Sequence, residues 1–253
     1  MKLFDLTGKT ALVTGGNRGL GFGIAEGLLD AGARVCIVAS SDSVFSAVDT
    51  LAEKGYDVLG LTCDLSNEQQ TERMFHQAVE KLGGRLDILC NNAGVQRRHM
   101  ATDFPLSDWD TVLNVNLRVV FQLSQLAANH MIPKGGGKII NIASLLTYFG
   151  GITVPAYAAS KGGVGQLTKA LSNEWAAQGI NINAIAPGYM ETDMNEALLE
   201  DKEGRYKEIS ARIPQGRWGT ANDMKGAAVF LSSAASDYLN GVIIPVDGGY
   251  IGR

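Results

Sequence analysis

The sequence predicts an α/β fold, in which a parallel sheet of about seven strands is covered on both faces by helices. Two features support this prediction. Short apolar runs alternate along the whole chain with longer amphipathic stretches, which is the order expected when each strand is followed by a helix. The chain has 253 residues, a length that suits one large α/β domain, so residues 1–253 are expected to form a single domain.

The apolar runs are expected to form the strands of this sheet. Their β-branched residues are continuous rather than alternating with polar ones, as in strands that are buried on both faces. Parallel strands of this kind are joined by right-handed crossovers through helices, which gives a doubly wound sheet. The predicted strands are Thr10–Thr14, Arg34–Val38, Asp57–Leu61, Leu86–Cys90, Lys138–Ile142, Ile180–Ala186 and Val242–Pro245.

The amphipathic stretches between these runs are expected to form helices. Glycines such as Gly32, Gly55 and Gly83 follow several of them, as is usual at the C-terminal end of a helix. The segment Glu191–Arg217 interrupts the alternation, and we expect it to form a lid over a substrate, with Trp218 packed against it. The predicted helices are Leu20–Ala31, Ser43–Lys54, Asn67–Leu82, Ser107–Met131, Pro155–Gln178 and Ala221–Ala234.

Charge and composition exclude several classes of partner. The net charge is −4 and the pI is about 5.4, so the chain has no basic field for nucleic acid. No apolar run is long enough to span a bilayer, and the segment Met1–Lys9 has no signal-peptide pattern. A cytoplasmic protein with neither a nucleic-acid nor a membrane partner is therefore expected.

The cysteines and histidines give no indication of a disulfide framework or a metal site. The cysteines are odd in number, form no C-x-x-C pair, and each lies in or at the end of a predicted strand: Cys36, Cys63 and Cys90. Buried, unreactive thiols are therefore expected. The histidines are scattered without the spacing of metal ligands, and no metal is expected.

A glycine-rich turn, Thr14-Gly15-Gly16-Asn17-Arg18-Gly19-Leu20-Gly21, joins the first predicted strand to the first predicted helix. In this context such a turn binds the diphosphate of a dinucleotide, because the helix N-terminus attracts an anion. Gly15 permits the tight turn, Gly19 lets the backbone approach the diphosphate, and Gly21 allows close packing. The turn therefore predicts a Rossmann-type domain, although a glycine turn that serves packing alone is the alternative.

Three residues further along the chain have the order and spacing of a hydride-transfer site. Tyr157 and Lys161 are four residues apart on a predicted helix, so both project from the same face. A tyrosine has an ordinary pKa of roughly 10, and a neighbouring cation lowers this pKa by stabilising the phenolate. Ser144 follows a predicted strand and can hydrogen-bond a substrate oxygen. An ordinary Tyr-x-x-x-Lys pair on a helix surface is the alternative.

Together these motifs resemble the short-chain dehydrogenase/reductase family, and the resemblance covers essentially the whole chain. It implies an oxidoreductase that transfers a hydride between a nicotinamide cofactor and a secondary alcohol or ketone. It also implies that Tyr157 exchanges the proton, that Lys161 tunes Tyr157 and anchors the nicotinamide ribose, and that Asn116 supports a water-mediated proton path. The expected catalytic residues are Ser144, Tyr157, Lys161 and Asn116. A homotetramer, formed through the two longest predicted helices and the C-terminal strand, is implied as well.

The same resemblance implies a set of cofactor contacts at the carboxyl ends of the strands, where open α/β sheets bind ligands. Asp64 and Leu65 would meet the adenine ring, unless Asp64 only caps the next helix. The signature N-N-A-G, Asn91–Gly94, would close around the ribose and steady the sheet, and Pro187, Gly188 and Thr192 would hold the nicotinamide carboxamide. The full expected set is Thr14, Gly15, Asn17, Arg18, Gly19, Leu20, Gly21, Ser40, Ser41, Asp64, Leu65, Asn91, Ala93, Gly94, Tyr157, Lys161, Pro187, Gly188 and Thr192.

Cofactor choice depends on the residues around the end of the second predicted strand. An acid there would bind the ribose 2′-hydroxyl and favour NAD, but Ala39 stands at that position. Arg18 could pair with the 2′-phosphate of NADP, and Ser40 or Ser41 could bond either form. Asp42 could replace the missing acid or cap the next helix. These residues favour NADP(H), whereas a narrower resemblance favours NAD(H), and NAD(H) is the expectation adopted here.

That narrower resemblance is to dehydrogenases of keto-deoxy sugar acids, which usually use NAD. It is carried by Asn91–Arg98, Gly150–Lys161, Asn173–Tyr189, Arg212–Gly219 and Ser236–Gly249. A sugar acid needs a cation for its carboxylate, and Arg97 or Arg98 is expected to bind it in bidentate fashion. The expected substrate contacts are Arg97, Ser144 and Tyr157. A pair of surface arginines is the alternative.

Other functions share these motifs. A gluconate 5-dehydrogenase and a 3-oxoacyl carrier-protein reductase are alternatives within the same chemistry. The carrier-protein enzyme needs a basic docking surface, against which the net charge of −4 argues. A non-catalytic dinucleotide-binding sensor is the alternative of another class, but all four catalytic positions are filled here.

Overall fold

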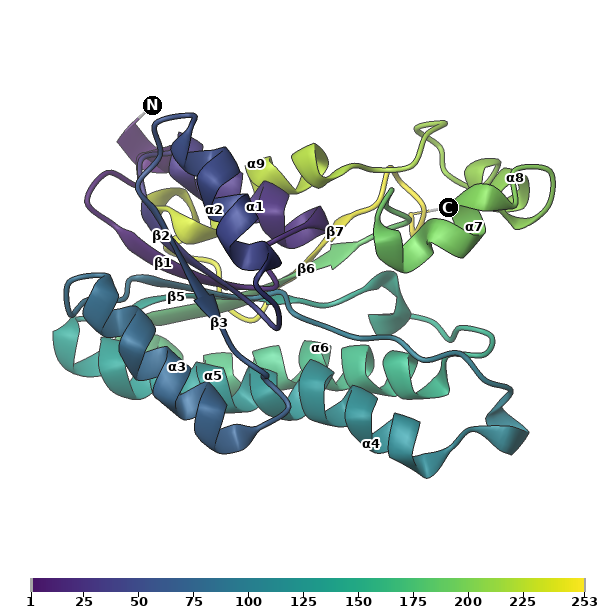
Figure 1. The fold of residues 1–253 in the computed structure, drawn as a ribbon, viewed down its shortest axis with the longest axis horizontal. Helices are drawn as coiled ribbons and strands as arrows, with labels where there is room; N and C mark the ends of the chain where they lie inside the picture. Colours follow the sequence, from purple (N-terminus) through teal and green to yellow (C-terminus); the bar gives the residue numbers. More distant parts are fainter. Residues whose placement is uncertain (1, 253) are drawn as a thin grey trace.

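A computed structural model describes residues 2–252, and its central feature is a sheet of seven parallel strands (Figure 1). The strand order is β3-β2-β1-β4-β5-β6-β7, and every pair of neighbours is parallel. The predicted doubly wound α/β fold is therefore confirmed. The strands are β1 (Thr10–Thr14), β2 (Arg34–Ala39), β3 (Val58–Thr62), β4 (Ile88–Asn91), β5 (Gly137–Ile142), β6 (Ile180–Pro187) and β7 (Ile243–Val246).

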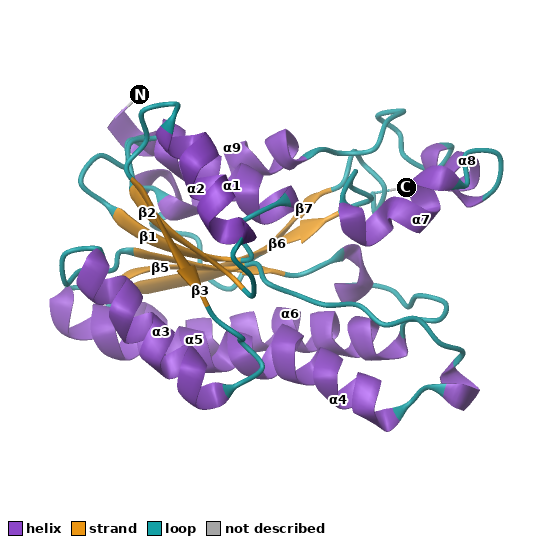
Figure 2. Ribbon diagram, in the orientation of Figure 1, coloured by secondary structure: helices purple, strands orange, loops and turns teal. Residues whose placement is uncertain are grey.

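Helices cover both faces of this sheet, as Figure 2 shows. They are α1 (Gly19–Asp30), α2 (Ser43–Ala52), α3 (Glu68–Lys81), α4 (Leu106–Leu113), α5 (Val119–Met131), α6 (Pro155–Trp175), α7 (Glu196–Glu200), α8 (Arg205–Ser210) and α9 (Ala221–Ser232). Ala11 and Val13 of β1 belong to the core under α1, α2 and α9, whereas Leu12 belongs to the core under α3, α5 and α6. Burial on both faces explains why the strands are continuous apolar runs.

The helix predicted over Ser107–Met131 is interrupted in the structure. α4 ends at Leu113, a π-helical turn covers Asn114–Arg118, and α5 begins at Val119. A π turn inserts an extra residue into a helix, often at a functional site, and here it includes the fully buried Asn116. The other predicted elements are present with ends shifted by a few residues. Short 3-10 turns, which the prediction did not distinguish from loops or from the ends of helices, cover Lys2–Phe4, Ala101–Asp103, Ile132–Lys134, Leu145–Thr147, Ala176–Gln178, Asp193–Asn195 and Ala234–Ser236.

The three cysteines are free and buried, as predicted. Burial raises the pKa of Cys36 and of Cys90 to about 12, so both thiols stay protonated at neutral pH. Within residues 2–252, no three His, Cys, Asp or Glu side chains gather in a way that would hold a metal ion. In the same part of the chain, no helix combines the length and the apolar character needed to cross a membrane.

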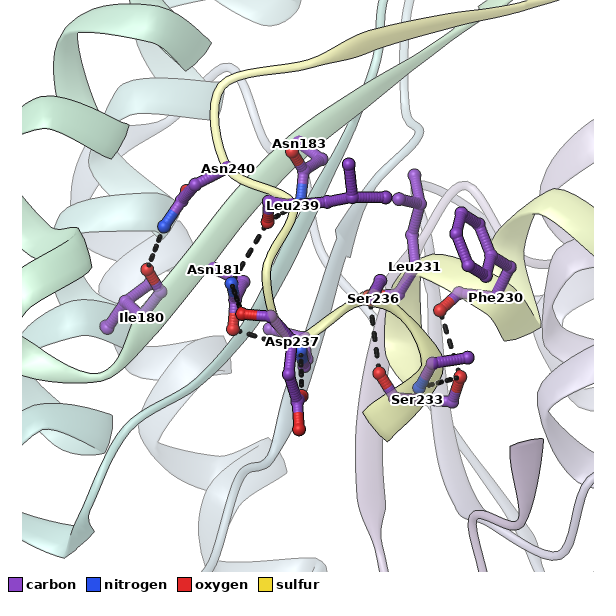
Figure 3. Close-up of polar contacts among 12 residues, drawn as sticks. Ile180, Asn181, Asn183, Phe230, Leu231, Ser233, Ser236, Asp237, Leu239 and Asn240 are labelled. Atoms are coloured by element: carbon purple, nitrogen blue, oxygen red, sulfur yellow. Dashed lines mark hydrogen bonds and ion pairs between the residues drawn. The ribbon is translucent and has the colours of Figure 1, made fainter. Parts of the chain in front are cut away.

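Two asparagines of β6 hold the connection from α9 to β7 (Figure 3). Asn181 Nδ2 donates to the carbonyls of Asp237 and Leu239, both at 3.0 Å, and Asn183 Nδ2 donates to the carbonyl of Leu239 at 3.0 Å. Asn240 Nδ2 donates in return to the carbonyl of Ile180 at 2.9 Å. Polar side chains in a buried strand need such partners, and these bonds fix β7 at the edge of the sheet.

The segment that interrupts the predicted alternation, residues 191–217, contains α7 and α8 and lies beyond the carboxyl ends of the strands (Figure 1). Its two ends are joined by a bridge between Met190 and Gly219, in which the Glu191 amide donates to the Gly219 carbonyl at 2.8 Å. The chain therefore leaves the sheet and returns to it at one point.

An aromatic cluster fills the space between this segment and the sheet. Trp218 is 1% exposed and stacks on Tyr206, with 5.2 Å between the ring centroids. Its indole donates to the Ser210 hydroxyl at 2.9 Å, so its polar atom is also satisfied. The packing role predicted for Trp218 is confirmed.

Candidate active site

The glycine turn between β1 and α1 forms a cradle that side chains would fill. Gly15 and Gly19 have positive φ angles of 66° and 52°. A Cβ at Gly21 would lie 2.0 Å from the Gly15 carbonyl oxygen, and a Cβ at Gly15 would lie 2.9 Å from Asn92 Nδ2. Gly21 thus permits close packing, as expected, but its neighbours are the turn and Asn92 rather than the sheet.

The N-terminus of α1 presents its free amide groups to this cradle. Its N-cap residue, Arg18, makes no side-chain capping bond, and the first turn contains no acid. The positive end of the helix dipole is therefore uncompensated at the crevice. Together with the absence of Cβ atoms at Gly15 and Gly21, this arrangement fits the anionic diphosphate of a nicotinamide dinucleotide.

Thr14 and the N-N-A-G turn join the end of β1 to the end of β4. The Thr14 hydroxyl accepts hydrogen bonds from the amides of Asn92 and Ala93, both at 3.0 Å. The Asn92 side chain donates to the carbonyls of Thr14 at 2.9 Å and Gly15 at 3.2 Å. These four bonds hold the glycine turn in place. The Thr14 hydroxyl therefore has a structural role in addition to its predicted contact with the cofactor.

Asn91 belongs to a buried network on the other side of the sheet. Its Nδ2 donates to Ser124 Oγ at 3.1 Å and to Asn141 Oδ1 at 2.9 Å. Asn141 Nδ2 donates in turn to Thr168 Oγ1 at 2.9 Å. The Asn91 side chain therefore steadies the sheet and is turned away from the crevice, which leaves only its backbone for the predicted cofactor contact.

Ser144 and Tyr157 come together from the end of β5 and the first turn of α6. Ser144 caps the 3-10 turn Leu145–Thr147, and its hydroxyl accepts from the Leu146 amide at 3.2 Å. Burial raises the pKa of Tyr157 above its usual range, while a hydrogen bond from Ser144 and the charge of Arg98 oppose this rise. The phenol is therefore protonated at neutral pH.

Lys161 lies against the ring of Tyr157, as the helical spacing predicted. Its ammonium is 5.6 Å from the ring centroid and donates to the Ile142 carbonyl at 2.6 Å. Burial lowers the pKa of Lys161 to about 8. The cation is therefore held over the ring face by a strand carbonyl, and the lowering of the Tyr157 pKa by Lys161 stays a prediction.

Asn116 holds the segment that follows the N-N-A-G turn. Its Oδ1 accepts from the Val95 amide at 2.8 Å, and its Nδ2 donates to the Val95 carbonyl at 2.9 Å. Nδ2 also donates to Oγ of Ser160 at 3.2 Å, and Ser160 directly precedes Lys161 in the chain. A Cβ at Gly94 would lie only 3.3 Å from Asn116 Oδ1, so a small residue suits that position. The water-mediated proton path through Asn116 stays a prediction.

A polar cluster follows the end of β2, where Ala39 stands at the position in which an acid would favour NAD. Asn17 Nδ2 donates to Ser43 Oγ at 2.8 Å, and the hydroxyls of Ser41 and Ser43 are 2.8 Å apart. Asp42 occupies the N-cap position of α2 but makes no side-chain capping bond. The carboxylate of Asp42 therefore does not cap α2. The hydroxyl of Ser43 is joined to the glycine turn through Asn17.

Arg18 connects the glycine turn to the 191–217 segment. Its Nη1 lies 2.8 Å from Asp193 Oδ2, and the two side chains are 72% and 67% exposed. Thr192, the adjacent residue, lies 3.6 Å from the position that a Cβ of Gly19 would take. The predicted nicotinamide contact Thr192 therefore lies over the predicted diphosphate site. Ser40 is exposed beside this region.

The two predicted adenine contacts differ in exposure. Asp64 is exposed, and its Oδ1 accepts from the Ser66 amide at 2.9 Å and the Ser66 hydroxyl at 2.7 Å. Leu65 is buried in the core under α3. Asn67 rather than Asp64 caps α3, since its side chain accepts from the Gln70 amide at 3.0 Å. The capping alternative for Asp64 is therefore wrong.

The end of β6 brings Pro187 and Gly188 next to β7. The Gly188 amide donates to the Val246 carbonyl at 2.9 Å. A Cβ at Gly188 would lie 2.7 Å from Asp247 Cα, so this position requires glycine. The predicted carboxamide contacts therefore lie where β6 opens into the 191–217 segment.

The neighbouring arginines Arg97 and Arg98 have different surroundings. Arg97 Nε lies 3.6 Å from Asp108 Oδ1, and its Nη1 donates to the Gln96 carbonyl at 3.2 Å. Arg98 instead acts electrostatically on Tyr157, and burial together with the charge of Arg205 lowers the pKa of its guanidinium. Arg98, unlike the paired Arg97, therefore contributes a charge that favours the phenolate of Tyr157.

Comparisons with known proteins agree with this geometry. A family model described as enoyl-(acyl carrier protein) reductase matches residues 15–251. A 2-dehydro-3-deoxy-D-gluconate 5-dehydrogenase from Bacillus subtilis is 50% identical over 251 residues, which cover 99% of this chain and 97% of that protein. The chain belongs to the short-chain dehydrogenase/reductase family.

Solved structures of the short-chain dehydrogenase/reductase family superpose on the whole chain. A 2-deoxy-D-gluconate 3-dehydrogenase from Agrobacterium tumefaciens with bound NADP is 48% identical, has a TM-score of 0.93 and covers 100% of both chains. A gluconate 5-dehydrogenase from Burkholderia cenocepacia, in complex with NADP and tartrate, is 40% identical, has a TM-score of 0.95 and covers 100% of this chain and 98% of that one.

Sequence reasoning about this dehydrogenase/reductase missed two contributors to the site. Asn92 was noted only as part of the signature, although its side chain holds both β1 and the glycine turn. The positive charge of Arg205 in α8 adds to the effect of burial in lowering the pKa of Arg98. The signature could have indicated Asn92, because a second polar side chain at a strand end needs partners. No local pattern distinguishes Arg205 from other exposed arginines.

Proposed function

We propose that the protein interconverts a secondary alcohol and a ketone on a deoxy sugar acid of the 2-dehydro-3-deoxy-D-gluconate type. The observation that carries this proposal is the placement of Ser144 and Lys161 against Tyr157, with the positive charge of Arg98 opposing the rise in the Tyr157 pKa. A cation beside a group that exchanges an alcohol proton suits a substrate that has both a carboxylate and a hydroxyl. The substrate named for the Bacillus subtilis relative supports the same class.

The residues of the chain account for the proton and for the orientation of the substrate. In reduction the Tyr157 phenol gives its proton to the carbonyl oxygen, and in oxidation the Tyr157 phenolate accepts the alcohol proton. Ser144 orients that oxygen through a hydrogen bond. The bound nicotinamide supplies or accepts the hydride. Lys161, whose ammonium lies over the ring of Tyr157, stabilises the phenolate that forms when the proton leaves.

Arg98 is proposed as the residue that binds the substrate carboxylate. Its guanidinium can form two parallel hydrogen bonds to a carboxylate, which fixes the orientation of the substrate as well as its affinity. Arg97 is already paired with Asp108. Tartrate, a hydroxy acid, in the Burkholderia cenocepacia complex supports a carboxylate site in this family.

NADP(H) is proposed as the preferred cofactor, in place of the NAD(H) expected from the narrower resemblance. Ala39 offers no carboxylate to the ribose 2′-hydroxyl, and a phosphate there would meet no negative charge from that position. Arg18 and the hydroxyls of Ser40, Ser41 and Ser43 supply a cation and donors. NADP in two related structures supports this choice.

The 191–217 segment is proposed to act as a lid over this site, within a single domain that spans the chain. A cytoplasmic homotetramer is proposed from the family resemblance. Its supporting feature is a shallow hollow of about 1010 Å³ on the outer face of α4, α5 and α6, where the apolar side chains of Leu117 and Phe121 are accessible. The mass of the protein in solution, measured by light scattering, tests the assembly.

The test of function is a turnover assay with 2-dehydro-3-deoxy-D-gluconate and with gluconate, each with NADP and NAD in parallel. Tyr157→Phe should lower kcat by about a thousandfold while the affinity for NADP stays unchanged, because only the proton-exchanging hydroxyl is lost. Tyr238→Phe is the matched control, since Tyr238 is fully exposed and distant from the site in sequence. Turnover of gluconate alone would favour the gluconate 5-dehydrogenase alternative.

Two further outcomes would identify the remaining alternatives. Turnover of 3-oxoacyl chains in preference to sugar acids would indicate the carrier-protein reductase that the family model names. Tight binding of NADP with no turnover of any of these substrates would indicate the non-catalytic sensor. Tyr157→Phe that is as active as the unmodified protein would contradict the proposed mechanism whatever the substrate.

A further inference from the structure

The loop that carries Arg98 is held at two points. Residues 95–100 have no regular secondary structure. At the start of this loop, the side chain of Asn116 bonds both the amide and the carbonyl of Val95, at 2.8 and 2.9 Å. At its other end, the His99 amide donates to the Thr153 carbonyl at 3.0 Å. Arg98 lies between these two anchors.

Asp108 of α4 provides a further contact at the second anchor, and both of its oxygens are used. His99 Nε2 lies 2.7 Å from Oδ2, and Arg97 Nε lies 3.6 Å from Oδ1. The edge of the Phe104 ring supports His99, with 5.1 Å between ring centroids. Asp108 also lies in the first turn of α4, where a carboxylate is stabilised by the helix dipole. Asp108 therefore contacts Arg97 and His99 from a separate helix.

The backbone opposite this anchor is strained. Thr153 has a φ of 65°, and it is the one residue other than glycine with a positive φ among residues 2–252. Such a conformation persists where surrounding contacts fix the backbone, and it is common beside binding sites. Here the strained residue supplies the carbonyl that accepts from His99, so the loop and the 148–154 turn support each other.

Both neighbours of Arg98, Arg97 and His99, thus contact the Asp108 carboxylate, whereas no ion pair joins Arg98 to Asp108. Among residues 2–252, Arg98 has no ion pair with an acid, and its charge acts on Tyr157. We propose that Asp108 is a positioning residue for substrate binding, which aims Arg98 at the substrate carboxylate by holding Arg97 and His99. The proposal rests on the carboxylate-binding role of Arg98 proposed above.

A double-mutant cycle tests this inference. Asp108→Asn should raise the KM for the sugar acid about fivefold and leave kcat and the NADP affinity unchanged, because a partly exposed charged contact is lost. Arg98→Met should raise KM by more, and the double variant should match Arg98→Met alone, since Asp108 acts through Arg98. Asp103→Asn is the control, because this exposed carboxylate of the same region accepts from the neighbouring Thr102 hydroxyl and contacts neither Arg97 nor His99.

Amide hydrogen exchange supplies a readout that does not depend on the substrate. Exchange at residues 95–100 should be about fivefold faster in Asp108→Asn than in Asp103→Asn, with the rest of the chain unaffected. Unchanged exchange, or additive effects of the two substitutions on KM, would overturn the inference. If Asp108→Asn unfolds, Arg97→Met and His99→Gln remove the two contacts singly. Faster exchange with no turnover of the sugar acid would leave the inference standing and remove the proposed substrate.

Discussion

The two sides of the crevice are built in different ways. On the glycine-turn side, residues 14–21 and 91–94, the chain is held by partly buried hydrogen bonds to backbone atoms, such as those of Asn92 and Thr14. On the other side, the 191–217 segment is held by an aromatic cluster and by exposed ion pairs such as Arg18–Asp193. Hydrogen bonds to the backbone fix the positions of atoms within a narrow range. Packed rings and surface ion pairs can be replaced by other side chains at a smaller cost in stability. The difference indicates that cofactor geometry is constrained more strongly than substrate access.

The largest effect should come from breaking the glycine-turn side. In Gly21→Ala, the new Cβ would lie 2.0 Å from a backbone carbonyl that cannot move without displacing Asn92. The free energy of unfolding should fall by about 3 kcal/mol and the NADP affinity by more than about a hundredfold, because overpacking here distorts the cradle. Thermal unfolding and isothermal titration measure the two effects.

Gly226→Ala in α9 is the matched control for this substitution. A Cβ there meets nothing within 4 Å, so alanine should stabilise the helix by up to about 1 kcal/mol. If Gly21→Ala and Gly226→Ala have equal stability and equal NADP affinity, then the turn is less constrained than the contacts indicate.

A second effect concerns the buried ammonium of Lys161. Its pKa falls from an ordinary value of 10.5 to about 8 in the folded chain, so between these pH values the unfolded state binds more protons. Stability due to this group therefore rises as pH increases from 8 to 10.5, and the penalty for burying the group is fully present below pH 8. Relative to Lys161→Met, the unmodified protein should gain on the order of 3 kcal/mol across this window.

Chemical unfolding of both proteins from pH 7 to 10.5 measures this difference. Lys207→Met is the control on the 191–217 segment, because the side chain of Lys207 is 72% exposed and has no burial penalty to lose. A difference between the unmodified protein and Lys161→Met that is independent of pH would show that the ammonium is not buried in solution.

The smallest effect should come from the exposed pair that joins the two sides. Asp193→Asn frees Arg18 for the 2′-phosphate, so the KM for NADP should fall about twofold while the KM for NAD stays constant, as expected for a surface ion pair. Steady-state kinetics with both cofactors measures this. Glu200→Gln, an exposed acid of α7 outside the ion pair, should leave both constants unchanged. Equal changes with the two cofactors would mean that Asp193 does not compete with the 2′-phosphate.

The sequence was sufficient to predict the sheet, because strands that are buried on both faces are continuous apolar runs. It was sufficient to predict the main helices, because glycines follow the ends of several of them. It was also sufficient for the spacing of Tyr157 and Lys161, since both lie on one helix. Contacts between distant segments could not be predicted in the same way. The π-helical turn around Asn116 lies within a stretch that the sequence predicted as one continuous helix.

Neighbouring residues were the hardest to distinguish. Arg97 and Arg98 have the same side chain and adjacent positions, and only the location of Asp108 on a separate helix separates their roles. Asn91 and Asn92 differ in the same way, because one faces the helices and the other faces the glycine turn. Which of two identical neighbours faces a site depends on the direction of the backbone at that point, which local composition does not determine.

The bridge between Met190 and Gly219 has a consequence for how such a protein can change. Because the 191–217 segment leaves and returns at one point, residues can be inserted, deleted or replaced within it without altering the distance that the flanking chain must span. The entropic cost of a longer closed loop grows only slowly with its length. A segment transplanted between the two ends of this bridge could therefore give the same hydride chemistry a new range of substrates.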